Sequence, residues 1–236
     1  MLSSLLYPAS IAVFGASRTP GKVGYEVVAN LKDAGFEGAI VPVNPTADEI
    51  LGLPCFPNLK AYGKPVDLGV IAVPTKMVRS AVDDAIHGGA KAIVVITAGF
   101  KEVDEEGAEM EHEIERLCTS RGVKLVGPNC LGVINTDHAM NASFASHMPR
   151  AGNISVISQS GALLTAILDL AAARDLGLGK LVSMGNKAQL DETDFLTALA
   201  SDEQTKVIVG YLESIASGDE FIRAAQQATT HKPVIV

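Results

Sequence analysis

The stretch "VFGASRTPGKVGYEVV", residues 13–28, contains residues that could bind an anion. A short apolar run leads into a turn with Gly15, Gly21 and Gly24, and a helical pattern begins near Lys22. At such a junction the free N–H groups of the helix and the positive end of its dipole point into the turn. The pattern predicts a phosphate site with Lys22 as its cation. The alternative is a glycine-rich turn that only packs the helix on the strand.

The spacing within this turn argues against two common phosphate loops. A nucleoside-triphosphate loop needs GxxxxGK followed by Ser or Thr, whereas five residues separate the first two glycines here and Val23 follows Lys22. The dinucleotide fingerprint also fails in spacing, and Asn44 and Pro45 stand where a nicotinamide-dependent oxidoreductase would place a ribose-binding acid. Coenzyme A needs no such acid, because its ribose carries a 3′-phosphate, and it is the nucleotide that we expect.

A second strand-to-helix turn, in "SVISQSGALLTAIL", brings serine hydroxyls and helix N–H groups to one point. This combination suits inorganic phosphate or an acyl phosphate. A GxSxG nucleophile elbow is disfavoured because Ser158 and Ala162 occupy its two glycine positions. Helix capping alone is the other interpretation, since serine is a favoured N-cap. The predicted phosphate-binding residues are Ser158, Gln159, Ser160, Gly161 and Ala162.

Other side chains that could do chemistry give weaker patterns. Asp191 and Asp194 could be taken for a metal pair, but their place at a predicted helix start favours capping, and no metal site is predicted. No histidine stands in a glycine-rich loop beside either turn, so none is expected to be catalytic. The histidines fall on predicted helices or in polar connections, and they are His87, His112, His138, His147 and His231.

Length and composition narrow the class of protein. At 236 residues the chain exceeds the usual size of one domain, so two domains are expected. A hydrophobic share of 47% and a charged share of 19% are typical of a soluble α/β protein. A net charge of −8 argues against nucleic acid or an anionic membrane as partner. Because Cys55, Cys118 and Cys130 form no CxxC pair, neither a disulfide framework nor a zinc site is expected. This cysteine usage is typical of a protein in the reducing cytoplasm, which is the expected location.

Apolar runs of strand length alternate with stretches of helical period, which predicts parallel sheets with helical crossovers. In the first half, strands are expected at 11–15, 39–44, 66–74, 92–97 and 123–127, and helices at 22–34, 75–87 and 103–120. Over residues 128–150 the pattern dissolves into Asn, Gly, His and Pro, which predicts a crossover between domains. The pattern restarts with strands at 153–158, 178–185, 206–212 and 232–236 and helices at 161–174, 191–200 and 219–229. Two successive doubly wound α/β units follow from this order.

The ordered set of motifs resembles the α-subunit portion of NDP-forming acyl-CoA synthetases, close to ADP-forming acetyl-CoA synthetase and more distantly to succinyl-CoA synthetase. The resemblance covers the whole chain. It implies a Rossmann-like CoA-binding domain over 1–127 and a flavodoxin-like domain over 128–236. The motifs are "IAVFGASRTPGKVGYEVVANL", "VPVNPTADEILGLPCFPNL", "VDLGVIAVP", "VITAGFKEVDEEGAE", "GPNCLGVIN", "ISQSGALLTAILD", "SMGNKAQLDETDFL" and "VGYLES".

The resemblance also implies which residues contact CoA. Asn129 and Cys130 match positions near the reactive thiol, although Cys130 equally fits a small buried hydrophobe and is not expected to be a nucleophile. Thr46 stands where relatives often carry lysine, so one ionic contact to CoA is expected to be missing. The implied CoA-binding residues are Gly15, Ser17, Gly21, Lys22, Val23, Asn44, Pro45, Val73, Pro74, Ile96, Thr97, Asn129 and Cys130.

By the same resemblance, acyl-CoA and phosphate give an acyl phosphate and CoA, and a phosphohistidine then carries the phosphoryl group to ADP. The implied catalytic residues are Ser160, Gly161 and Glu213, where Glu213 matches the acid that hydrogen-bonds the phosphohistidine; a strand-end surface glutamate is the alternative. The phosphohistidine is expected beyond the strand "KPVIV", which reads as an inner strand, so the second domain is expected to be incomplete at Val236.

The resemblance further implies partners that this sequence does not contain. Mg-ADP or Mg-ATP would bind an ATP-grasp part, supplied by a β-subunit or by fused C-terminal domains, and the assembly is expected to be a hetero- or homo-oligomer. Acyl-CoA is the expected small-molecule partner. A CoA-responsive regulatory module of a protein acetyltransferase-type fusion, without ligase activity, is the alternative function.

Overall fold

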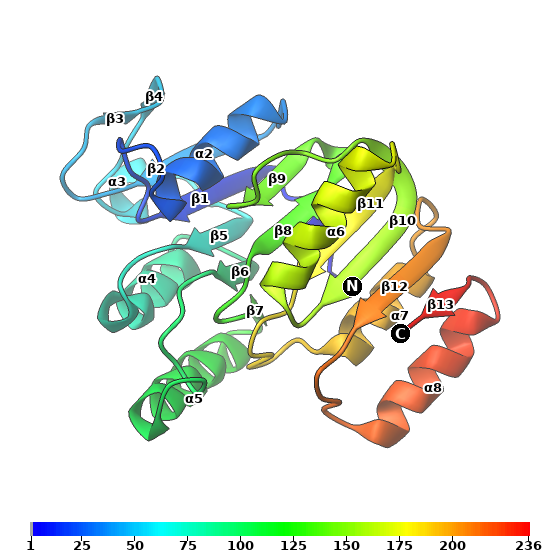
Figure 1. Ribbon diagram of the computed structural model, residues 1–236. Coiled ribbons are helices and arrows are strands. Elements are labelled where there is room, and N and C mark those ends of the chain that lie inside the picture. Colours follow the sequence, from blue (N-terminus) through cyan, green and yellow to red (C-terminus); the bar gives the residue numbers. More distant parts are fainter. Residues whose placement is uncertain (1) are drawn as a thin grey trace.

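The computed structural model describes residues 2–236, in which two sheets lie side by side with helices on their faces (Figure 1). The first sheet has the strand order β2-β1-β5-β6-β7, and every neighbouring pair is parallel. This confirms the parallel sheet predicted for the first half. Its strands are β1 (Ser10–Phe14), β2 (Ala39–Val43), β5 (Leu68–Ile71), β6 (Ala92–Val95) and β7 (Lys124–Val126).

Three long helices connect the strands of the first sheet, close to the predicted ranges. A two-stranded hairpin after β2 and two short helices were not predicted from the sequence. The long helices are α2 (Val23–Asp33), α4 (Thr75–His87) and α5 (Glu105–Ser120); the short ones are α1 (Ser3–Leu6) and α3 (Leu59–Tyr62), and the hairpin is β3 (Glu49–Ile50) with β4 (Leu53–Pro54).

The second sheet has the order β13-β12-β10-β11-β8-β9. Its first four strands are mutually parallel, whereas β8 and β9 are antiparallel to their neighbours. The strands are β8 (Gly132–Asn135), β9 (Met140–Ser143), β10 (Ala151–Ser158), β11 (Leu178–Ser183), β12 (Val207–Tyr211) and β13 (Val234–Ile235); the helices are α6 (Gly161–Ala173), α7 (Glu192–Ala200), α8 (Gly218–Thr229) and the 3₁₀ helix η1 (Thr136–His138).

Burial explains why these segments adopt these elements. β5 and β6 are buried at every position, as expected for parallel strands covered on both faces. α2 places Val27, Val28 and Leu31 in the core. α7 begins at Asp191, which accepts from the N–H groups of Thr193 and Asp194 in a capping box, so the predicted capping role of this aspartate pair is confirmed.

One prediction for the second half was wrong. The crossover predicted over 128–150 contains the β8–β9 hairpin, and its buried polar side chains explain the error: Asn135 donates to Leu6 O (2.7 Å) and Ser143 donates to Asn141 Oδ1 (2.6 Å). Strand β13 pairs in parallel with β12, as predicted, and Ile235 is exposed.

The hairpin joins the two sheets. β9 packs along α2, and the Asn30 side chain on α2 donates to the carbonyl oxygens of Ser143 (2.9 Å) and Ala145 (2.8 Å). One hydrophobic core runs through the contact, with Val13 of the first sheet and Val133 of the second in the same cluster. The division of the chain at residue 127 stays a prediction, but the first sheet ends at Val126 and the second begins at Gly132.

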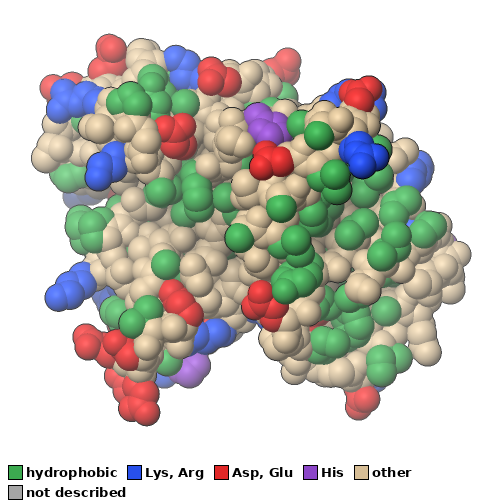
Figure 2. All heavy atoms as spheres, viewed as in Figure 1, with side chains coloured by type: hydrophobic (Ala, Val, Ile, Leu, Met, Phe, Trp, Pro, Cys, Tyr) green, Lys and Arg blue, Asp and Glu red, His purple; other side chains and the backbone are tan. Residues whose placement is uncertain are grey.

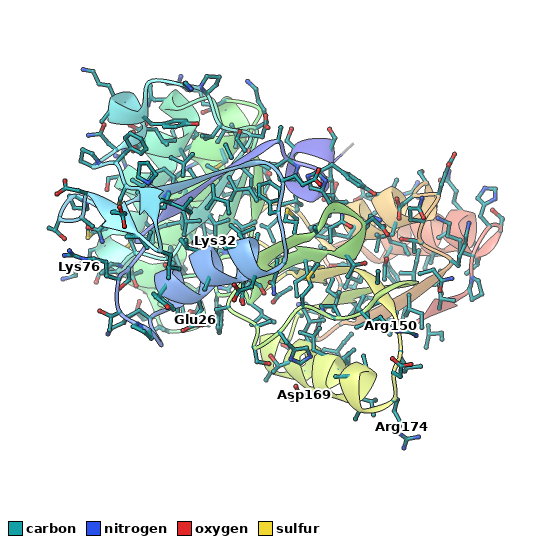
Figure 3. All side chains as sticks on the ribbon, turned by 90° about the horizontal axis from the view of Figure 1, so that it is seen from above. Glu26, Lys32, Lys76, Arg150, Asp169 and Arg174 are labelled. Atoms are coloured by element: carbon teal, nitrogen blue, oxygen red, sulfur yellow. The ribbon has the colours of Figure 1, made fainter. Side chains whose placement is uncertain are left out.

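The surface is mixed in character. Figure 2 shows charged side chains mainly toward the upper and lower margins of one face, with apolar side chains gathered over the region of α6 and β12. Viewed from above, Asp169 on α6 and Arg174, the C-cap residue of α6, point outward at the periphery of the molecule (Figure 3). Over residues 2–236, no helix combines the length and apolar character that crossing a membrane requires.

Candidate functional site

A single cavity of about 1350 Å³ lies at the carboxyl ends of parallel strands from both sheets. Turns after β1, β2, β5 and β6 line it from the first unit, and turns after β10 and β12 line it from the second. Open α/β sheets bind ligands at this edge. Of the predicted site residues, all except Gly21 and Ser158 line the cavity.

The turn after β1 is shaped by two glycines that leave no room for a side chain. Gly15 has a positive φ of 80°, and its N–H donates to Val43 O (3.1 Å). A Cβ on Gly24 would lie 2.0 Å from the Gly15 carbonyl oxygen. The first turn of α2 is thereby held against the end of β1, so the helix N-terminus opens into the cavity.

Lys22 is the N-cap of α2 and is exposed, and its side chain makes no capping hydrogen bond. Val23 and Gly24, the first residues of α2, line the cavity beside it. This leaves an ammonium group and a helix N-terminus at the same end of the cavity, which is the arrangement that binds phosphate groups.

Gly21 was predicted to contact the ligand but does not line the cavity. Its N–H donates to Glu26 Oε1 (2.7 Å), so the carboxylate of the first turn of α2 folds back over the preceding loop. Gly21 has a positive φ of 81° and is exposed. Its role in this structure is to let the chain turn into the helix.

Asn44 and Pro45 follow β2 and line the cavity as predicted. The Asn44 side chain donates to Ala16 O (2.7 Å) and so ties the end of β2 to the turn after β1. Its Oδ1 accepts from the N–H and the hydroxyl of Thr46 (2.8 and 2.9 Å). The side chain of Thr46 is therefore engaged in the turn.

The turn after β10 is built by two serines with different roles. Ser160 caps α6 by accepting from the N–H of Leu163 (3.2 Å), and it lines the cavity together with Gly161 and Ala162. Ser158 is fully buried and does not line the cavity, contrary to prediction. Its hydroxyl donates to Ser160 O (2.7 Å) and accepts from Ser160 N (3.1 Å), so it shapes the turn from beneath.

Gln159 links this turn to Glu213. Its Oε1 accepts from the N–H groups of Glu213 (2.6 Å) and Ser214 (3.0 Å), and its Nε2 donates to Ser214 Oγ (3.1 Å). The loop after β12 is therefore fixed to the turn after β10, and this places the exposed residue Glu213 at the cavity wall.

Asn129 and Cys130 lie where the first unit passes into the second. Asn129 is exposed with a positive φ of 58°, whereas Cys130 is buried and its Sγ donates to Val95 O (3.2 Å). Burial raises the pKa of the Cys130 thiol to about 12. The thiol is therefore neutral near pH 7, which supports the interpretation of Cys130 as a small buried hydrophobic residue.

Several lining residues were not predicted from the sequence. Met77, Ser80, Ala81 and Asp84 recur at helical spacing along one face of α4, a signal that could have been found because α4 begins at the end of a predicted strand. Phe144 comes from the hairpin segment that the sequence analysis treated as a crossover. The further unpredicted residues include Pro57, Asn58, Ala98, Leu131 and Thr165.

No histidine of residues 2–236 lines this cavity. His138 lies instead between the rings of Tyr7 (5.6 Å between centroids) and Phe36 (5.5 Å), and its Nε2 is 2.8 Å from Pro8 O. Within the described residues, no three His, Cys, Asp or Glu side chains are grouped as a metal site.

Comparison with known proteins gives matches to two family models. Residues 9–136 match the CoA binding domain, and residues 151–236 match the succinyl-CoA ligase like flavodoxin domain. The chain is 46% identical over 235 residues to "Acetate--CoA ligase [ADP-forming] I" of Archaeoglobus fulgidus, covering 100% of this chain and 34% of that protein. It is 40% identical to "Acetate--CoA ligase [ADP-forming] II subunit alpha" of Pyrococcus furiosus, covering 100% of this chain and 51% of that subunit.

Among solved structures, the chain is similar to the dinucleotide forming acetyl-coenzyme A synthetase 1 of Ca. Korarchaeum cryptofilum in complex with phosphate and ADP. The TM-score is 0.95 at 41% identity, covering 99% of this chain and 50% of that one. This chain thus spans about a third to a half of the length of these relatives.

Proposed function

Because the chain belongs to the family of CoA binding domains and carries a succinyl-CoA ligase like flavodoxin domain, we propose that it is the CoA-binding part of an ADP-forming acyl-CoA synthetase. The reaction interconverts acyl-CoA, ADP and phosphate with a carboxylic acid, CoA and ATP. One observation carries the proposal: a single cavity joins two helix N-termini, one from each unit. Such a cavity can hold a phosphorylated carrier and a second anion together.

The turn after β1 receives the phosphates of CoA in this proposal. Lys22 and the N-terminus of α2 supply the positive potential, and Asn44 and Pro45 lie toward the nucleotide end. The cavity continues past Val73 and Thr97 to Asn129. The hydroxyl of Thr97 donates to Val73 O (2.7 Å) and so joins the ends of two strands. CoA would lie along these strand ends with its thiol near Asn129 and the second unit.

The turn after β10 receives phosphate. A phosphate oxygen attacks the thioester carbonyl carbon of acyl-CoA, the C–S bond breaks, and the CoA thiolate leaves and takes up a proton. The products are acyl phosphate and CoA. The N-terminus of α6 at Ser160 and Gly161 faces the negative charge of the phosphate, which is an electrostatic role. Glu213 stands at the same wall, ready to orient a phosphoryl-accepting imidazole.

The transfer from acyl phosphate to ADP needs two further groups. We place the phosphohistidine in the part of the second domain that follows the strand "KPVIV", and the Mg-nucleotide site in an ATP-grasp β-subunit or in fused C-terminal domains, in a hetero- or homo-oligomer. The three free, buried cysteines agree with a cytoplasmic location.

Calorimetric titration of the 236-residue chain with CoA, and separately with NADH, tests the proposal. CoA should bind and NADH should not, because no acid follows β2 at the ribose position. Binding of NADH alone would overturn the proposal. The chain is then incubated with the partner and labelled ATP. Acid-labile, base-stable phosphate on His138, His147 or His231 would contradict the placement of the site, and CoA binding without any turnover in the full assembly would favour a regulatory module.

A further inference from the structure

The loop between β11 and α7, residues 184–191, joins the second unit to the end of the first sheet; we call it the bridging loop. Its backbone follows the end of the first sheet. The N–H groups of Asn186 and Ala188 donate to Pro128 O and Gly127 O (both 2.9 Å), and that of Leu190 donates to Leu125 O (3.2 Å). The loop of the second unit is thus fixed to the strand that leads to Asn129.

The side chain of Asn186 extends this contact to the cavity. Its Oδ1 accepts from Asn129 Nδ2 (3.3 Å), and its Nδ2 donates to Glu111 Oε2 (2.8 Å). Glu111 is 2% exposed and pairs with Lys101 (2.9 Å), which also donates to Asn186 O (2.5 Å). The position of Asn129 is therefore set by a network that begins in α5 and passes through the bridging loop.

The next residue of the loop reaches in the opposite direction. Lys187 has a positive φ of 56°, which is unusual for a lysine, and its side chain is 7% exposed. Its Nζ lies 2.7 Å from Glu192 Oε2 and donates to Ser214 O (2.8 Å). Glu192 is fully buried, and its Oε1 accepts from Ala216 N (2.6 Å). The Lys187–Glu192 pair thus forms hydrogen bonds with two backbone groups of the loop that carries Glu213.

We infer that Lys187 and Glu192 are positioning residues, which hold Glu213 at a fixed place relative to Asn129 through the bridging loop. The inference rests on the proposed function and deepens it. Gln159 fixes the start of the Glu213 loop, and the ion pair fixes the carbonyl of Ser214 and the N–H of Ala216. The backbone that carries the Glu213 side chain is thereby anchored on both sides along the chain.

The chemistry of the pair agrees with this role. Burial by itself would raise the pKa of Glu192, but the hydrogen bonds from Lys187 and Ala216 lower it, so the carboxylate is ionised at neutral pH. Hydrogen bonds to ionised groups are shorter and stronger than those between neutral groups. A neutral pair of similar shape would fill the same space and grip the loop less firmly.

The test uses K187M, the conservative variant K187R and the double variant K187M/E192Q. The double variant removes both charges and so leaves no unpaired buried charge that could prevent folding. It therefore separates loss of the ion pair from simple misfolding. K206M is the matched control, because Lys206 is exposed and its ammonium group donates to a backbone carbonyl oxygen, that of Glu203 (2.8 Å). Hydrogen–deuterium exchange at the amides of Glu213 and Ser214 is measured in this chain. In the complete enzyme, kcat and the KM for CoA are measured.

We expect faster exchange at both amides in K187M and in the double variant, with kcat lower by roughly tenfold to a hundredfold. The KM for CoA should change little, because the CoA phosphates bind at the other end of the cavity. K187R should restore most of the slow exchange and most of the kcat, and K206M should match the wild type in both. Unchanged exchange in the double variant overturns the inference whatever the enzyme does. Faster exchange together with an E213Q variant that keeps the kcat of the wild type leaves the anchor in place and overturns the proposed role of Glu213.

Discussion

The turns after β1 and β10 are both strand-to-helix junctions at one cavity, yet they are built differently. The turn after β1 ends at Lys22, whose side chain does not cap α2 and is free to reach a ligand. The turn after β10 ends at Ser160, whose hydroxyl is already used by the N–H of Leu163, and Ser158 braces it from below. The turn after β1 depends on the close packing of its glycines and on a hydrogen bond from the Asn44 side chain, whereas the turn after β10 is held by the hydroxyls of its own two serines.

This difference fits two different anions. An uncapped helix N-terminus with an adjacent ammonium suits a multiply charged group that binds and stays, such as the diphosphate of CoA in the proposed function. A neutral, internally bonded turn offers fewer donors and keeps its shape when empty, which suits a phosphate that must arrive and leave in each cycle. The same strand-to-helix junction can therefore suit either an anion that stays bound or an anion that exchanges in each cycle.

The largest expected effect comes from breaking the glycine packing of the turn after β1. In G24A the new methyl group would meet the Gly15 carbonyl, so the free energy of unfolding should fall by about 1–3 kcal/mol and CoA binding should be lost. Thermal melting and calorimetry measure the two effects. G218A is the control, because no atom lies within 4 Å of its added Cβ. Undiminished CoA binding in G24A would contradict the assignment of this turn.

Removing the ammonium group should have the next largest effect. K22A should weaken CoA binding by about 1–3 kcal/mol, the scale of a charge-assisted hydrogen bond, and leave the melting temperature nearly unchanged because Lys22 is exposed. Lys76 on α4 does not line the cavity, so K76A serves as the control in the same titration. Equal affinities for K22A and the wild type would show that Lys22 does not contact the ligand.

The turn after β10 should respond in stability rather than in CoA affinity. S160A removes the cap of α6 and should lower the free energy of unfolding by about 1 kcal/mol, with CoA affinity unchanged. Ser217 is the matched control, since it occupies the N-cap position of α8 without a side-chain hydrogen bond, and S217A should change stability by less than about 0.5 kcal/mol. Urea unfolding separates the two, and equal losses in both variants would contradict the capping role.

The smallest expected effect is a pH dependence of the free energy of unfolding that comes from Glu192. The pKa of Glu192 is lowered in the folded protein from an ordinary value of 4.5, so its ionised form stabilises the fold above that pH. This contribution is lost as the pH falls through the lowered pKa. The difference in Tm between the wild type and E192Q should shrink as the pH falls from 7 toward 3. E203Q, at an exposed site, should show no such trend, and a constant E192Q difference would exclude the linkage.

The first sheet could be predicted from the sequence because its strands are uniformly apolar and its helices have one apolar face. The β8–β9 hairpin could not. Its strands have four residues each and include Asn135, Asn141 and Ser143, which are buried with hydrogen bonds rather than with apolar contacts. A polar pattern signals a loop unless its hydrogen-bond partners are known, and Leu6, the partner of Asn135, lies far away in the sequence.

The site was predictable where it follows strand ends and hidden where it depends on tertiary contacts. Strand ends located Gly15, Asn44 and Thr97 beside the cavity. Phe144 escaped prediction together with its hairpin. Ser158, which was predicted to bind phosphate, directs its hydroxyl to the backbone of Ser160. A serine that shapes a turn and one that faces a ligand look alike in sequence, and only the direction of the hydroxyl tells them apart.

The hairpin also has a mechanical consequence. It belongs to the second sheet through its pairing with β11 and to the first unit through α2, where Asn30 holds its backbone. A hinge rotation of one unit against the other would have to strip β9 from α2 or break the sheet, either of which exposes buried core. The two walls of the cavity are therefore joined by buried packing, and the CoA of the proposed function would enter a preformed cavity.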